Sequence, residues 1–122
     1  MDKLSLEKIS QSDGRYKSDG VKFVYEGLAY TVRKIKQEPG HISGQDLSHG
    51  LRKMALEKWG RLAKVVLNGY GIKTTRDFGE IVYLLIDNGW LSAQPNDTID
   101  DFNDVFDFQK EFIDNFQFTS KA

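Results

Sequence analysis

The sequence predicts a mainly α-helical fold, a compact bundle of about five helices with a small extended or wing-like element near the C-terminus. Apolar residues recur every three or four positions through most of the chain, and capping residues and glycines separate these stretches. Only one short segment alternates apolar and polar residues. At 122 residues, the chain fits a single domain, 1–122, and we expect its core at about 15–112 between short flexible ends.

The N-terminal third predicts a short helix at "LSLEKI", a turn-rich loop at "SDGRYKSDG", and a long amphipathic helix of about five turns. The apolar side of the long helix comprises Val21, Val24, Tyr25, Leu28, Val32 and Ile35. We expect Ser18 or Asp19 to cap its start and the sequence "EPG" at 38–40 to stop it.

The middle third predicts two further helices. Ser43 and Asp46 have the spacing of a capping box. The apolar stripe that follows comprises Leu47, Leu51, Ala55 and Trp59. We expect Gly60 to break or kink this helix, because glycine weakens helix interiors. The next segment, "RLAKVVLN", places Leu62, Val65 and Val66 on one face.

Two helix ends resemble each other, "VVLNGYGI" and "LLIDNGWL". Each has Asn-Gly after an aliphatic run and an aromatic residue directly after it. This pattern predicts left-handed C-caps at 68–69 and 88–89. Tyr70 and Trp90 are then expected to fold back on the last turns, which explains them better than a ligand platform does.

The last long helix begins with "TTRDFG", and its tripeptide DFG matches the magnesium-binding letters of protein kinases. The chain lacks the glycine-rich loop, the strand lysine and the HRD loop that a kinase needs. We interpret Asp77 instead as the partner of Thr74 in a capping box. The buried stripe is expected to be Phe78, Ile81, Val82 and Leu85. Gly79 is expected to allow close approach by a neighbouring element.

The C-terminal segment "TIDDFNDVFDFQKEFIDNFQF" contains six of the eight phenylalanines, interleaved with acidic residues. It predicts an extended piece near 105–108, followed by a turn or two of helix, with the rings packed on the helical body. A helix followed by such a piece is similar to the closing part of a winged helix. The candidate recognition helix carries Asp77, Glu80 and Asp87 against Arg76 alone, which does not suit reading DNA.

Charge is divided along the chain. Residues 1–76 contain 15 Lys or Arg against 8 Asp or Glu, whereas residues 77–122 contain 2 against 10. An acidic tail folded onto a basic body, two faces for different partners, and ordinary pairing of solvated charges all fit this division, and we favour pairing.

No cysteine is present and no apolar run reaches membrane-span length, so we expect a cytoplasmic protein without disulfides, thiol catalysis or a membrane partner.

Few residues indicate chemistry. The two histidines, His41 and His49, lack the spacing of a zinc site or a catalytic pair. The acidic run at 97–104 lacks the pattern of an EF-hand loop and is interpreted as a solvated face. We therefore predict no catalytic residue, metal or cofactor. Candidate partner-binding residues, for which a solvated face is the simpler explanation, are Arg33, Lys34, Arg52 and Lys53.

Four segments, "RYKSDGVKFVYEGLAYTVRKI", "HISGQDLSHGLRKMALEKWG", "TTRDFGEIVYLLIDNGWLS" and "DDFNDVFDFQKEF", resemble in order and spacing the Minf family of small bacterial proteins. The resemblance spans roughly residues 15–112 and implies one self-contained domain. It implies no activity, and no site residue follows from it.

Three functions remain open at this stage. The charge division and the aromatic, acidic C-terminal segment favour a non-catalytic protein-interaction module. The alternative is a winged-helix-like protein that binds nucleic acid through its basic body, with salt-dependent affinity. A small enzyme whose site is assembled from distant residues is the third, and it would need His41 or His49 in a pocket beside a carboxylate.

Overall fold

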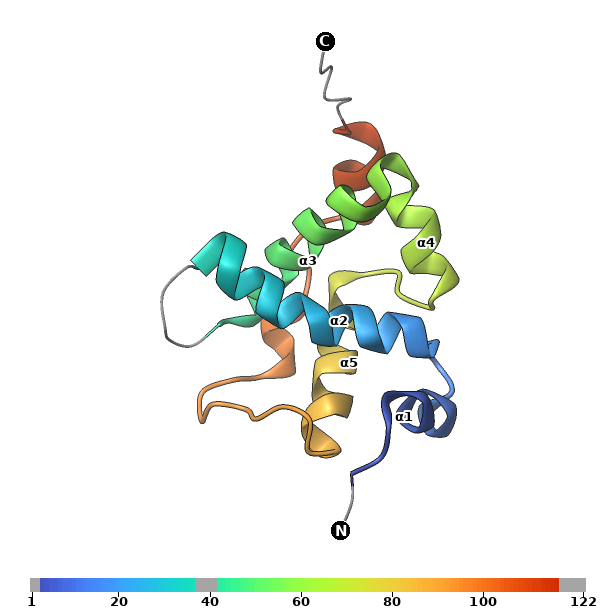
Figure 1. Ribbon diagram of the computed structural model, residues 1–122. Helices are drawn as coiled ribbons and strands as arrows, with labels where there is room; N and C mark the ends of the chain where they lie inside the picture. Colours follow the sequence, from blue (N-terminus) through green and yellow to red (C-terminus); the bar gives the residue numbers. More distant parts are fainter. Residues whose placement is uncertain (1–2, 37–41, 117–122) are drawn as a thin grey trace.

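The computed structural model describes residues 3–36 and 42–116. Within these ranges the mainly α-helical prediction is confirmed (Figure 1). The α-helices are α1 (Leu6–Asp13), α2 (Ser18–Thr31), α3 (Gly44–Trp59), α4 (Ala63–Gly69) and α5 (Thr75–Asp87). Short 3-10 turns form η2 (Gly60–Leu62) and η3 (Ile99–Phe102), and π-helical turns form η1 (Val32–Lys36) and η4 (Lys110–Asp114).

The C-terminal segment differs from the expected wing-like element. No β-strand occurs in the described ranges, and residues 105–107 connect η3 to η4 without pairing to another segment as a strand. Instead, phenylalanines hold the segment on the helices: the Phe78 and Phe108 ring centroids are 5.7 Å apart and those of Phe108 and Phe112 are 5.2 Å apart. The predicted packing of these rings on the helical body is therefore confirmed, because Phe102, Phe108 and Phe112 are buried. Phe118 lies outside the described residues.

The core lies where α2, α3 and α5 meet, and the C-terminal segment contributes Phe102, Phe108 and Phe112 to it (Figure 1). The predicted stripe of α5 is confirmed, since Phe78, Ile81, Val82 and Leu85 are all buried. In α3, Leu47, Leu51 and Ala55 are buried and Trp59 is half-buried, packed on Phe23 at a centroid distance of 5.1 Å. None of the helices in the described part of the chain has the length and apolar character needed to cross a membrane.

Two of the three predicted helix starts are confirmed. Capping boxes join Ser43 to Asp46 at the start of α3 and Thr74 to Asp77 at the start of α5. The prediction for α2 was wrong: Ser18 is already helical, and the N-cap position is Lys17, whose side chain makes no capping hydrogen bond. A backbone hydrogen bond from Lys17 N to Tyr70 O (3.0 Å) holds this start instead. The stop expected at 38–40 lies outside the described residues.

Two of the predicted apolar faces have residues that are exposed to solvent instead of buried in the core. The π-helical turn η1 has more residues per turn than the α-helix before it, which rotates the stripe of α2 toward solvent. Val32 and Ile35 are accordingly 37% and 40% exposed. After Gly60 ends α3, the 3-10 turn η2 likewise shifts the register of α4. Ala63 and Leu67 are buried there, whereas the predicted face exposes Leu62 at 60% and Val65 at 67%.

The two similar helix ends adopt different structures. At the end of α5, Gly89 is left-handed (φ 80°), as predicted, and Trp90 N donates to Leu85 O (2.8 Å). The prediction for α4 was wrong by two residues, because the helix includes Gly69 and the left-handed residue is Gly71 (φ 93°). A Cβ on Gly71 would overlap the carbonyl oxygen of Arg15, so the approach of the α1–α2 loop fixes where the turn occurs.

The two aromatic residues after these ends contact distant segments of the chain. The indole N–H of Trp90 donates to Leu4 O (2.7 Å), and its ring makes an edge contact with Tyr25 of α2 at a centroid distance of 5.3 Å. Tyr70 makes an edge contact with Trp59 at 6.0 Å. Each ring therefore contributes to packing between elements.

Candidate functional site

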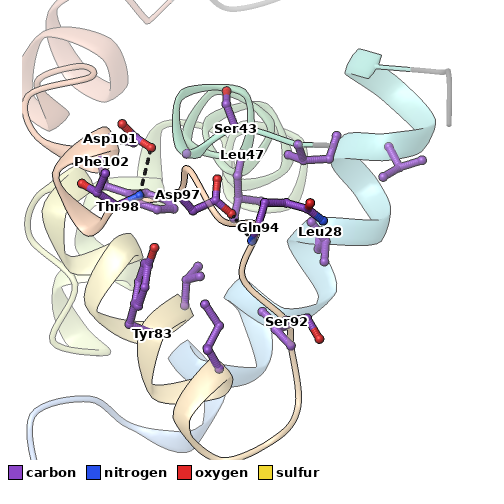
Figure 2. Close-up of a pocket in the computed structure, with 16 residues that line it drawn as sticks. Leu28, Ser43, Leu47, Tyr83, Ser92, Gln94, Asp97, Thr98, Asp101 and Phe102 are labelled. Atoms are coloured by element: carbon purple, nitrogen blue, oxygen red, sulfur yellow. Dashed lines mark hydrogen bonds between the residues drawn. The ribbon is translucent and has the colours of Figure 1, made fainter. Parts of the chain in front are cut away.

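A cleft of about 260 Å³ lies between α2, the start of α3, α5 and the segment that leads to η3 (Figure 2). We call it the acidic cleft. Its apolar floor includes Leu28, Leu47, Val82, Ile86, Leu91 and Phe102. The polar residues around it include Ser43, Tyr83, Gln94, Asp97, Thr98 and Asp101.

Phe102 forms the end of the floor because two glycines leave room for its ring. A Cβ on Gly44 would lie 2.9 Å from one ring carbon, and a Cβ on Gly79 would lie 2.8 Å from another. The predicted close approach at Gly79 is therefore found, and η3 is the element that approaches. The buried Thr75 hydroxyl adds a polar tie by donating to Phe102 O (2.6 Å) and accepting from Val105 N (3.1 Å).

The acidic side of the cleft is fixed by local hydrogen bonds. Asp97 Oδ2 accepts from Gln94 N (2.8 Å), and Asp101 Oδ2 accepts from Thr98 N (3.3 Å) in the capping box of η3 (Figure 2). Asp100 points elsewhere, since its Oδ1 accepts from Arg76 Nη1 (2.9 Å). Two of the four acids in the run at 97–104 thus line the cleft, and the chain presents them in fixed positions.

The described residues that line the acidic cleft include no Lys, Arg or His. Burial raises the pKa of the Tyr83 hydroxyl above its usual value, and the negative charges of Asp97 and Asp101 raise it further. Tyr83 therefore stays protonated and neutral through the physiological pH range. The cleft combines an apolar floor with a negatively charged side, which suits an apolar group attached to a cation.

The four candidate partner-binding residues do not form one continuous surface along α3. Arg33 lines an open hollow of about 990 Å³ on the side where Met54 and Glu57 of α3 face α2. Arg52 faces the other way, because its Nη1 lies 3.8 Å from Glu111 of η4. Lys34 and Lys53 are exposed on η1 and α3. At 100° per residue, Arg52 and Glu57 project to nearly opposite sides of α3.

Ion pairs join the basic and acidic parts of the chain. Arg15 Nη1 lies 3.1 Å from Glu80 Oε1, and Arg76 Nη1 lies 2.9 Å from Asp100 Oδ1. The Arg52–Glu111 pair also joins a cation of the basic part to a carboxylate of the acidic part. Pairing of solvated charges, the favoured interpretation of the charge division, accounts for these residues.

His49 does not lie in a pocket beside a carboxylate. Its side chain is exposed on α3, and its ring stacks on Phe106 at a centroid distance of 6.1 Å. His41 lies outside the described residues. In the ranges 3–36 and 42–116, no group of three or more His, Cys, Asp or Glu side chains is arranged to hold a metal ion.

The sequence did not reveal the acidic cleft, because its residues come from segments far apart in the chain. Leu28, Leu47 and Val82 belong to apolar stripes that the sequence predicts on three different helices. The signal that could have found the site is the turn-rich loop at 92–97 followed by acids at i and i+4, Asp97 and Asp101. Comparisons of the chain with protein-family models, with curated proteins and with solved structures give no match.

Proposed function

We propose that this protein is a cytoplasmic, non-catalytic interaction module that binds a partner protein through the acidic cleft. The bound group is an apolar side chain of the partner, with a neighbouring Lys or Arg against Asp97 and Asp101. The observation that carries the proposal is the apolar floor beside two carboxylates held by backbone N–H groups. The cysteine-free composition supports a reducing compartment.

The size of the cleft fits a single side chain of a partner protein. Pockets for small molecules usually measure about 300–1,000 Å³, and this one measures about 260 Å³. A cavity of about 150 Å³ already holds benzene. The acidic cleft therefore has room for one aliphatic or small aromatic side chain and part of its neighbour, which is the anchor geometry of protein interfaces.

Titration of the ¹⁵N-labelled protein with short peptides tests this function. A peptide with one leucine between lysines should shift the backbone signals of cleft residues such as Leu28, Leu47 and Leu91, whereas the same peptide with glutamates should not. The shifts should weaken as salt is added, since charge attraction at a surface is screened. Shifts confined to other surfaces, or none with either peptide, would contradict the proposal.

A matched pair of variants sharpens the titration. Asp101→Asn removes one charge of the cleft but keeps an oxygen that accepts from Thr98 N. Asp104→Asn removes a charge from the same segment outside the cleft, at a left-handed residue (φ 51°) that asparagine tolerates. We expect Asp101→Asn to weaken binding of the lysine peptide several-fold and Asp104→Asn to leave it nearly unchanged.

A further inference from the structure

The turn from α3 to α4 presents a second apolar surface with the opposite charge. Leu62 and Val65 are the most exposed of the large apolar residues in the described part of the chain. The sequence from 61 to 65, "RLAKV", also contains Arg61 and Lys64 and no acid. We call these four residues the basic tip.

The acids of the neighbouring turn η4 are engaged in other contacts. Glu111 lies near Arg52 at 3.8 Å, and Asp114 Oδ1 accepts from Gln109 Nε2 (3.1 Å). Ile113 of η4 extends the apolar surface beside Leu62, together with Phe116. The basic tip thus combines an apolar surface with Arg61 and Lys64, which adjoin it in the sequence, and the acidic cleft is an apolar hollow with a negatively charged border.

The two surfaces adjoin opposite ends of α3, and in Figure 1 α4 lies near one end of this helix and η3 near the other. Gly44, the first residue of α3, lines the acidic cleft, and Trp59, its last residue, precedes the basic tip. A helix of 16 residues is about 24 Å long. The tip therefore cannot reach the cleft of its own molecule, but it can reach that of another.

We propose that the partner that occupies the acidic cleft is a second copy of this chain, which inserts Val65 or Leu62 of its basic tip. This inference rests on the proposed function and names its partner. Lys64 of the inserted tip, next to Val65, lies against Asp101 of the receiving cleft. The contact joins two different surfaces, so each added copy leaves one tip and one cleft available and the assembly grows head to tail. An interface with so few anchors is small and transient.

Sedimentation velocity of the full chain tests the proposal, at concentrations up to about 1 mM, where contacts of millimolar affinity become visible. The average mass should rise with concentration and pass that of a dimer. Val65→Asp, which spoils the tip, and Gln94→Arg, which adds a cation at the exposed edge of the cleft, should each give a monomer. Gln11→Asp and Gln11→Arg introduce the same charges on the exposed side of α1 and should associate as the parent does.

Mixing the two defective variants separates a head-to-tail contact from a symmetric one. Val65→Asp keeps an intact cleft, and Gln94→Arg keeps an intact tip, so an equal mixture should form a dimer and grow no further. A parent that stays monomeric at the highest concentration, a symmetric dimer, or a mixture that stays monomeric would each overturn the inference. If the lysine peptide still shifts the cleft signals, the proposed function is retained and only the inference that the partner is a second copy is refuted. If neither the peptide nor a second copy binds, both the inference and the proposed function are refuted.

Discussion

Helices α4 and α5 end in similar sequences, but they differ in which of their apolar residues are buried. Both carry an apolar run followed by Asn-Gly and an aromatic residue. In α5 every residue of the predicted stripe is buried, because α2, α3 and η3 pack around it. In α4, Ala63 and Leu67 are buried, while Val65 faces solvent. The comparison teaches that periodicity selects a helix, but the neighbours that cover the helix decide which of its faces is buried.

The largest effect is expected where α5 is most tightly enclosed. Gly79→Leu places a branched side chain against the Phe102 ring, which already lies 2.8 Å from a Cβ at this position. Because an overfilled core is strained, we expect a loss of about 3 kcal/mol or more in the free energy of unfolding. Gly69→Leu, at the end of α4 with nothing within 4 Å of a Cβ, should change it by about 0.5 kcal/mol or less. Equal urea midpoints for the two variants would contradict the comparison.

The two helix ends give the next largest effect. Gly71 and Gly89 are both left-handed, at φ 93° and 80°, but only Gly71 faces a backbone carbonyl that an added Cβ would overlap. Left-handed backbone costs alanine about 1 kcal/mol, so Gly89→Ala should lose about that much. Gly71→Ala should lose at least about twice as much, because the Arg15 carbonyl must also move. Thermal unfolding of both variants measures the difference, and similar losses would remove the role assigned to Arg15.

Thr75→Val tests the polar tie between α5 and η3. The valine keeps the shape of threonine, but it leaves Phe102 O and Val105 N without the hydroxyl that now serves both. We expect a loss of about 1–2 kcal/mol in the free energy of unfolding. Thr75→Ser keeps the hydroxyl and should lose less. A valine variant that is more stable than the serine variant would show that the hydrogen bonds contribute little.

The smallest effect concerns Glu80 on the solvent side of α5, and it depends on pH. Its hydrogen bond to Arg76 Nε (3.1 Å), and less strongly that to Arg15, holds the pKa of Glu80 below its usual value of 4.5. A lowered pKa stabilises the folded state above pH 4.5 and loses that contribution as the pH falls through the folded-state value. Glu80→Gln should therefore be slightly less stable than the parent at pH 7, and the difference should shrink as the pH falls below 4.5. A stability difference that persists in acid would assign the effect to packing instead.

Local signals in the sequence predicted much of α5 and α3. The capping boxes at Ser43 and Thr74, the break at Gly60 and the role of Gly79 each depend on residues within a few positions, or on one missing side chain. Such features survive folding because the hydrogen bonds that define them form within one turn. Membership of the Minf family stays a prediction.

The rest of the fold depended on contacts that no local pattern contains. The left-handed turn after α4 lies at Gly71 because the Arg15 carbonyl comes close to it, 56 positions away in the sequence. The acidic cleft needs Leu28, Val82 and Asp101 from three segments, and the sequence pattern of its acids is also that of an ordinary solvated face. Changes of helical period at η1 and η2 turned apolar residues outward, and the amino-acid pattern does not mark such changes.

The basic tip and the acidic cleft each have a tryptophan close by in the chain, which can serve as an optical reporter. Trp59 lies between Phe23 and Tyr70, next to the turn that carries Leu62. Trp90 contacts Tyr25 and Leu4 and directly precedes Leu91, which lines the cleft. These are the only tryptophans in the chain, so a Trp59→Phe or Trp90→Phe variant leaves a single emitter of known location. A change in the emission wavelength of such a variant then reports, without any added label, whether the basic tip or the acidic cleft has bound a partner.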